Sequence, residues 1–325
     1  MKREYRFALG IGGVGLAGII AYAATGLYSG ALILVAAPAA PLAVLCMVWG
    51  RMRRRFPLRA LLLGLVIGPA VALLAHPAVA AFMVAFVSGF GDSGRHLVEA
   101  LRIDPRLTTA LASPWILVLL VDLITVAPLT EEFGKALGAV AARPKSRQDA
   151  FLFGAAAGTG FAVIENFLYV GTATAAGDLW PVVALSRVVG AAVHPLASGL
   201  VMLGWWEWRH DRRVRRLLRG YFSGAGIHAL WNGTLVVIGM VVSTALATSE
   251  TAGASLPIAF TFGALLGAIM LIVLWWVSGS VAEERPLVTF RFGSARSLAA
   301  LVIAGASLLI PLAVLVITFP HFYRG

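Results

Sequence analysis

Residues 151–170 read FLFGAAAGTGFAVIENFLYV, an apolar run that contains one carboxylate side chain, Glu165. An α-helix rises about 1.5 Å per residue, so a run of about 20 residues crosses the roughly 30 Å hydrocarbon core of a bilayer. An acid inside such a run is costly unless it faces other protein groups. The stretch therefore predicts a transmembrane helix inside a bundle, with Glu165 turned toward the bundle interior.

The remainder of the chain repeats this apolar pattern. Of its 325 residues, 60% are hydrophobic and 13% are charged, and the mean hydropathy is +0.89. A soluble domain carries about 25% charged residues, so the composition excludes a soluble enzyme. We predict an all-α, polytopic integral membrane protein with about nine transmembrane helices. The nine apolar runs, in chain order, are residues 7–28, 31–49, 58–86, 114–140, 151–170, 181–206, 221–247, 256–277 and 298–319.

The basic residues predict the orientation of the chain. There are 26 Lys and Arg against 15 Asp and Glu, a formal net charge of +11. With a cytoplasmic N-terminus and nine spans, 20 of the 26 basic residues fall on the cytoplasmic side and the C-terminus lies outside. These residues lie in segments 2–6, 51–59, 143–147, 209–219 and 285–296. Anionic lipid headgroups are a sufficient partner for this charge, so the bilayer is the expected partner and nucleic acid is not.

Polar side chains are concentrated in spans four to seven. These spans contain Asp122, Glu131, Glu132, Lys135, Glu165, Asn166, Arg187, His194, His228 and Asn232. The other five spans contain one ionisable side chain, His76. We predict a single membrane domain over residues 1–325, in which accessory spans in 1–112 and 248–325 surround a catalytic core at 113–247. Counting residues to the nearest cytoplasmic charge cluster places the glutamates and histidines roughly 14 to 24 Å deep, which predicts one shared site.

The charges of these spans leave two mechanisms open. Four acids face two bases, an excess of two negative charges: Asp122, Glu131, Glu132 and Glu165 against Lys135 and Arg187. A divalent cation bound with His194 and His228 would neutralise the excess, or two carboxyls stay protonated. Either arrangement can activate water for attack on a carbonyl, while Asn232 or a histidine stabilises the oxyanion. This chemistry is that of peptide hydrolysis.

Spacing predicts several local contacts. Lys135 is one helical turn from Glu131 and Glu132, so we expect it to form an ion pair with one of them. Arg187 lies seven residues before His194, on the same helical face, and is expected to neutralise Asp122 or a site glutamate.

Glycine and proline predict packing and bends. Gly154, Gly158 and Gly160 predict a close helix contact, as do Gly224 and Gly226. A proline follows each of two histidines: His76-Pro77 predicts a break in span three, and His194-Pro195 predicts a bend in span six.

Four motifs in the polar spans resemble those of a known family. They are EEFGK at 131–135 (EExxK), FAVIEN at 161–166 (FxxxEN), HPLAS at 194–198 (Hxxx and a small residue) and HALWN at 228–232 (HxxWN). In this order, on polytopic spans, they resemble the PrsW family of intramembrane proteases, within the superfamily of the CaaX-processing prenyl endopeptidases. The resemblance implies a peptidase of the bacterial plasma membrane that cuts membrane proteins at or near their transmembrane segments.

The resemblance also implies roles for the motif residues. It casts the pair Glu131 and Glu132 as water-activating or metal-binding, and Glu165, His194 and His228 as further ligands or stabilisers of the transition state. A zinc ion would then be held by Glu131, Glu165, His194 and His228, with Asn232 also in the site. In the prenyl endopeptidases a histidine stands where this chain has Glu165, so a metal-independent glutamate mechanism stays open beside the zinc mechanism. The expected substrate is a membrane protein, and the family's anti-sigma factor is the example that the resemblance suggests.

Two other classes of function fit the same residues. Glu165, His194 and His228 could form the relay of an ion- or proton-coupled transporter. A non-catalytic scaffold could use the same polar interior to hold transmembrane partners.

Overall fold

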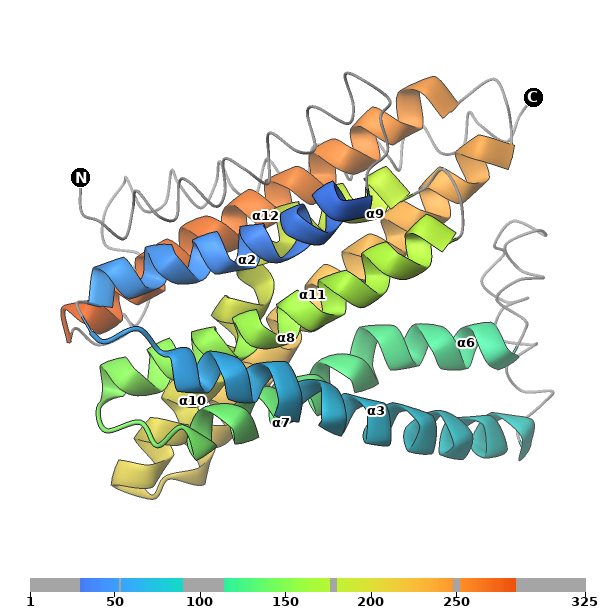
Figure 1. The fold of residues 1–325 in the computed structure, drawn as a ribbon. Helices are drawn as coiled ribbons and strands as arrows, with labels where there is room; N and C mark the ends of the chain where they lie inside the picture. The colour runs from blue at the N-terminus through green and yellow to red at the C-terminus, as the bar shows by residue number, and fades with distance from the viewer. Residues whose placement is uncertain (1–29, 53, 90–113, 176–179, 248–251, 285–325) are drawn as a thin grey trace, which may run out of the picture.

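The computed structural model describes residues 30–52, 54–89, 114–175, 180–247 and 252–284, and these residues are helical apart from short connections (Figure 1). The helices are α2 (Gly30–Met52), α3 (Leu58–Gly89), α6 (Pro114–Val121), α7 (Ala127–Ala141), α8 (Arg147–Ala175), α9 (Trp180–Val189), α10 (Val193–Asp211), α11 (Val214–Ala247) and α12 (Ala252–Ala282). A π-helical segment, η1 (Asp122–Val126), joins α6 to α7, and a 3-10 turn, η2 (Gly190–Ala192), joins α9 to α10.

The all-helical membrane fold predicted from sequence is confirmed in these residues. Seven of the nine predicted spans coincide with helical segments, and the runs at 7–28 and 298–319 lie outside the described residues. Within the described ranges, four helical stretches are long and apolar enough to cross a bilayer: Leu58–Val79, Arg147–Tyr169, Ser186–Asp211 and Thr261–Ala282.

Helix α8 lies at the centre of the bundle. It contacts α10, α3, α2 and α7. In Figure 1, α2 and α12 lie side by side on one flank of α8, and α3 and α7 lie on the other. The connections that carry the basic segments 51–59, 143–147 and 209–219 lie at the same end of the bundle, the left in this view.

Both interrupted spans are broken one turn before a proline. A proline lacks the N–H of a regular helix, and its ring clashes with the carbonyl group four residues earlier. For Pro128 that carbonyl belongs to Ile124, inside η1, and for Pro195 it belongs to Ala191, inside η2. The 3-10 turn η2 thus lies where the sequence predicts a bend, and it separates α9 from the helix that carries His194.

The predicted break at His76 is wrong. Helix α3 runs without interruption from Leu58 to Gly89 and includes both Pro69 and Pro77. A single proline removes one backbone hydrogen bond, which can kink a long helix without ending it. The side chain of His76 instead reaches α7, where its Nε2 lies 3.0 Å from Oγ1 of Thr130.

Glycines let the central helices touch through their backbones. A Cβ at Gly154 or Gly158 would collide with the backbone carbonyls of Ser198 and His194 on α10. Gly160 faces α3 instead, where the nearest atom is the carbonyl oxygen of Leu61. The predicted close contact is thus confirmed, but these glycines serve two faces of α8 rather than one.

The paired glycines of α11 differ, and this difference gives a stability test. A Cβ at Gly224 would lie 2.5 Å from the carbonyl oxygen of Ala197 and 2.6 Å from Cγ2 of Val201, whereas one at Gly226 meets no described atom within 4 Å. The predicted contact is confirmed at Gly224 and wrong at Gly226. We expect Gly224→Ala to destabilise the protein by about 1–3 kcal/mol through overpacking. Gly226→Ala should leave stability unchanged or raise it, because alanine is the better helix former.

Thermal melting of the detergent-purified variants measures this difference. Two variants with the same melting temperature would contradict the close approach of α10 and α11.

Candidate active site

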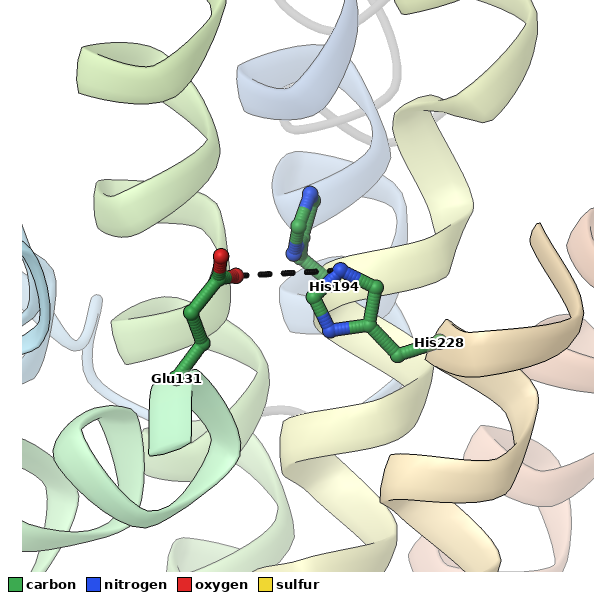
Figure 2. Close-up of side chains that lie close together, drawn as sticks. All are labelled: Glu131, His194 and His228. Atoms are coloured by element: carbon green, nitrogen blue, oxygen red, sulfur yellow. Dashed lines mark ion pairs between the residues drawn. The ribbon is translucent and has the colours of Figure 1, made fainter. Parts of the chain in front are cut away.

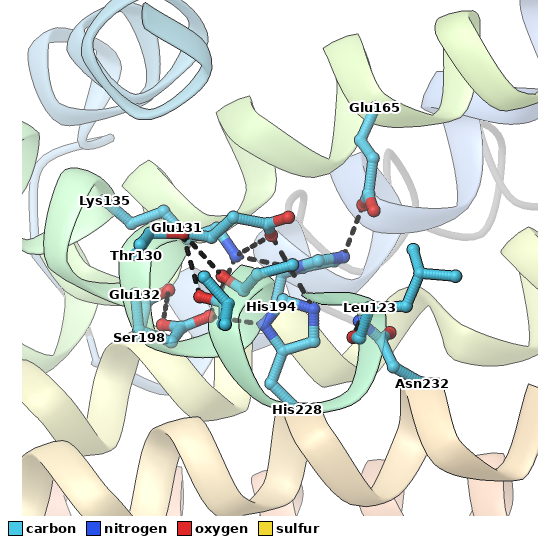
Figure 3. Close-up of polar contacts among 12 residues, drawn as sticks. Leu123, Thr130, Glu131, Glu132, Lys135, Glu165, His194, Ser198, His228 and Asn232 are labelled. Carbon is cyan, nitrogen blue, oxygen red and sulfur yellow. Dashed lines mark hydrogen bonds and ion pairs between the residues drawn. The ribbon is translucent and has the colours of Figure 1, made fainter. Parts of the chain in front are cut away.

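Four helices direct their ionisable side chains to one place inside the bundle (Figure 3). Helix α7 carries Glu131, Glu132 and Lys135, and helices α8, α10 and α11 carry one member each. Glu132, Lys135 and His228 have no exposed surface, and the other three members are at most 8% exposed. We refer to these six side chains as the polar cluster: Glu131, Glu132, Lys135, Glu165, His194 and His228. The fold thus brings together glutamates and histidines that are up to 97 residues apart in the sequence.

The ammonium group of Lys135 connects both glutamates of α7 to a histidine of α10. Its Nζ lies 2.8 Å from Oε1 of Glu132, 3.1 Å from Oε2 of Glu131 and 2.9 Å from Nδ1 of His194. These three contacts match the three N–H donors of lysine. The predicted ion pair is therefore confirmed, and it involves both glutamates. Because an ammonium group only donates, Nδ1 of His194 accepts and the ring proton lies on Nε2.

The other ring nitrogen of His194 faces Glu165. Its Nε2 lies 2.8 Å from Oε2 of Glu165. The same carboxylate oxygen pairs with Nη2 of Arg187, and Nε of Arg187 donates to Oδ1 of Asn166 at 2.6 Å. The prediction that Arg187 neutralises a site glutamate is confirmed, and His194 is fixed between a lysine and a glutamate.

Glu132 holds a histidine in a defined orientation. Its Oε1 accepts from Nδ1 of His228 at 3.1 Å, and its Oε2 accepts from Oγ of Ser198 at 2.7 Å. With its proton on Nδ1, the ring of His228 presents a lone pair at Nε2. Among the described residues this Nε2 has no hydrogen-bond partner although it is buried. A carboxylate that orients a histidine in this way is the usual second partner of a histidine metal ligand.

Glu131 lies opposite that free nitrogen. Its Oε2 is 3.7 Å from Nε2 of His228, the pair marked by the dashed line in Figure 2. One carboxylate oxygen and two imidazole nitrogens, from Glu131, His194 and His228, lie within 4.8 Å of one another. Two histidines and one carboxylate are a donor set that zinc takes in hydrolases.

The fit of a metal to this set can be judged from spacing and charge. Ligands at about 2.0–2.1 Å from zinc lie roughly 3.3 Å apart in a tetrahedron, so the side chains would close in around the ion. Lys135 contacts two of the three ligands and supplies positive charge at that point. The donor chemistry fits zinc, provided that Lys135 moves away from these atoms. Glu165, the fourth ligand predicted from sequence, lies outside the three-residue set and pairs with Arg187.

Asn232 contacts the backbone of the interrupted span. Its Nδ2 donates to the carbonyl oxygen of Leu123 in η1 at 2.9 Å. A π-helical segment displaces backbone carbonyls from their regular partners, and this amide satisfies one of them. The hydrogen bond thus ties α11 to η1, four residues after His228.

Asp122 belongs to a second polar group near η1. Its Oδ2 lies 3.9 Å from Nδ1 of His76 on α3. Spacing allows Asp122 or a site glutamate as the partner of Arg187, and the structure pairs Arg187 with Glu165. Asp122 therefore lies with His76 and apart from the polar cluster.

Sequence reasoning missed two further contacts. Oγ of Ser198 donates to Glu132, and the hydroxyl group of Tyr221 donates to the carbonyl oxygen of Leu129 at 2.6 Å. A sequence signal exists for the second, because Tyr221 lies seven residues before His228 and therefore on its helical face.

The sequence was also compared with known protein families, curated proteins and solved structures. A family model described as "PrsW family intramembrane metalloprotease" matches residues 54–252, which include the whole polar cluster. No curated protein and no solved structure matches the chain.

Proposed function

Because the chain belongs to the PrsW family of intramembrane metalloproteases and is therefore a peptidase, we propose that it hydrolyses peptide bonds of membrane proteins at or near their transmembrane segments. In this proposal, Glu131 contacts the water molecule that attacks the peptide bond. The observation that carries this proposal is the contact between Oε2 of Glu131 and the unpartnered Nε2 of His228 in a buried cluster of the described residues. Family membership favours proteolysis over the transporter and scaffold alternatives.

The roles of the two adjacent glutamates differ in this proposal. In the metal-free form of the proposal, Glu131 takes a proton from the water that attacks the carbonyl carbon, and that proton passes to the leaving amine nitrogen. Glu132 accepts three hydrogen bonds, from Lys135, Ser198 and His228, and we assign it to positioning. A base needs a free lone pair near the water. Glu132 has three of its roughly four acceptor sites occupied, whereas Glu131 accepts one hydrogen bond, from Lys135.

The remaining residues support the same reaction. His194, whose ring centroid lies 4.7 Å from that of His228, is assigned to positioning, because Lys135 and Glu165 engage both of its ring nitrogens. Glu165 with Arg187 fixes the ring of His194, and Asn232 fixes α11 against η1. In the zinc form of the proposal, Glu131, His194 and His228 would instead be the ligands of the ion, which would lower the pKa of its bound water and polarise the scissile carbonyl.

The proposed setting is the bacterial plasma membrane, with a cytoplasmic N-terminus and an external C-terminus. The gathering of three basic connections at one end of the bundle supports it. By family resemblance, an anti-sigma factor with a transmembrane segment is the first substrate to test. Comparison of the membrane proteome of cells that carry the wild-type protein or Glu131→Gln should reveal substrates that accumulate only in the variant.

Metal content distinguishes the zinc mechanism from the glutamate mechanism. We expect detergent-purified protein to hold zinc at about one ion per chain, bound by the two-histidine, one-carboxylate set of the described residues. His228→Ala should lower the zinc content by removing a ligand, and a chelator should remove both zinc and proteolysis, with activity restored by added zinc.

Elemental analysis measures the ratio of zinc to protein. Cys46→Ala is the control, because this buried thiol is not among the three possible zinc ligands. A zinc-free preparation with full activity would contradict the zinc mechanism and leave Glu131 as the sole activator of water.

A further inference from the structure

A second site lies at the end of the bundle where α10 meets α11. A cavity of about 1000 Å³ opens there, between the first turn of α8, the last turns of α10 and the first turns of α11. None of its lining residues belongs to the polar cluster. The cavity therefore needs its own explanation.

Arginine dominates the charged lining of this cavity. Four arginines and two glutamates line it, a formal charge of +2 from +4 and −2: Arg147, Arg215, Arg216 and Arg219 with Glu207 and Glu284. Arg216 is engaged by acids, with Nε 2.6 Å from Asp211 and Nη1 3.5 Å from Glu207. Among the described residues, Arg215 and Arg219 have no carboxylate within 4 Å and are exposed. Two guanidinium groups thus face the cavity without a counter-charge from the described part of the chain.

The backbone adds positive potential at the same place. Helix α8 begins at Arg147, and α11 begins at Val214, so the N-termini of two helices meet at the cavity. The partial positive charge of a helix N-terminus favours an anion, and phosphate above all. Arginine adds the planar pair of donors that matches phosphate oxygens.

The inner wall of the cavity is apolar. Leu200, Leu203 and Ile227 line it, and Leu203 is 2% exposed. A basic rim above an apolar wall suits an anion that is joined to an apolar group, as in a phospholipid. The basic segments 143–147 and 209–219, which the sequence assigns to one membrane surface, both contribute to this rim.

We propose that this arginine cavity binds the phosphate group of an anionic ligand, with Arg215 and Arg219 as its principal partners. The same chemistry is offered by the headgroup of an acidic phospholipid and by phosphate free in solution. Binding here does not depend on the proteolytic mechanism, because the cavity shares no side chain with the polar cluster.

Titration calorimetry of the full-length protein in detergent tests the proposal with three probes. The probes are short-chain phosphatidylglycerol, short-chain phosphatidylcholine and inorganic phosphate. We expect saturable binding of phosphatidylglycerol, of phosphate or of both, and binding of the zwitterionic phosphatidylcholine that is weaker by about ten-fold or more. If inorganic phosphate displaces bound phosphatidylglycerol, the cavity binds the free ion as well as the lipid headgroup. If phosphate does not compete, the cavity binds the lipid headgroup alone.

Two double variants, each of which removes two positive charges, test whether the anion binds in the cavity or elsewhere on the basic surface. Arg215→Gln with Arg219→Gln should weaken binding about ten-fold or more, because each arginine loses a charged hydrogen bond. Arg212→Gln with Arg213→Gln removes the same charge just outside the cavity and should change the affinity less than about two-fold. Both pairs are exposed, so melting temperatures should match the wild type. Equal losses in the two doubles, equal affinity for the two lipids, or no saturable binding of either anion would overturn the proposal.

Discussion

Glu131→Gln is expected to reduce kcat/KM for a transmembrane peptide substrate by about 10²–10⁴-fold, the usual contribution of a general base. The amide keeps the size of the side chain and can still accept a hydrogen bond from Lys135, so the fold should survive. It cannot take a proton from water, and it is a poor ligand for zinc. The loss should therefore appear in kcat, under either form of the proposed mechanism.

Glu132→Gln is the matched control for this experiment. It lies next in sequence on the same helix and is also buried. An amide oxygen can still accept from Nδ1 of His228, so we expect a smaller loss of about 10–100-fold, as for other partners of functional histidines. Cleavage would be measured in lipid nanodiscs with size-exclusion profiles as the check of folding. Full activity in Glu131→Gln, or a greater loss in Glu132→Gln, would reverse the assigned roles.

Arg187→Met is expected to destabilise the protein by about 3–5 kcal/mol, because it leaves the buried carboxylate of Glu165 without its cation. Arg187 and Glu165 are 6% and 8% exposed, so water cannot replace the lost partner. Arg187 also holds Oδ1 of Asn166. The variant should accumulate poorly in the membrane and melt at a lower temperature.

A double-mutant cycle separates this ion pair from simple loss of packing. Adding Glu165→Gln to Arg187→Met removes the unpaired charge. The melting temperature of the double variant should therefore be closer to that of the wild type than to that of Arg187→Met. The proposal would be contradicted if Arg187→Met had the stability of the wild type, or if the double variant were no more stable than Arg187→Met. Either result would mean that Arg187 does not stabilise the buried carboxylate of Glu165.

The sequence predicts the helices of the described residues well, because seven of the nine apolar runs coincide with helical segments and four of these stretches have the length and hydropathy that a bilayer requires. It also predicts that Lys135 pairs with its neighbours on α7, since contacts within one or two turns follow from helical spacing alone. Contacts within a helix can therefore be inferred from the order of the residues.

Contacts between helices are less predictable. Glu131 and Glu132 are adjacent and chemically identical, and only packing against Ser198 and His228 distinguishes the positioning glutamate from the one that faces the free nitrogen. Arg187 has two candidate partners by spacing, and the choice of Glu165 depends on how α8 and α9 lie together. The π-helical segment is likewise contacted from another helix, by Asn232, which lies 109 residues after Leu123 in the chain.

The position of Lys135 bears on how the enzyme matures. Its ammonium group links Glu131, Glu132 and His194, and so neutralises charge where ligands for a metal converge. Many small metallo-domains fold only when their metal is bound. Here Lys135 supplies an internal cation that holds α7 and α10 together without a metal, so under the proposed zinc mechanism we expect the ion to bind the folded bundle and to displace this ammonium group.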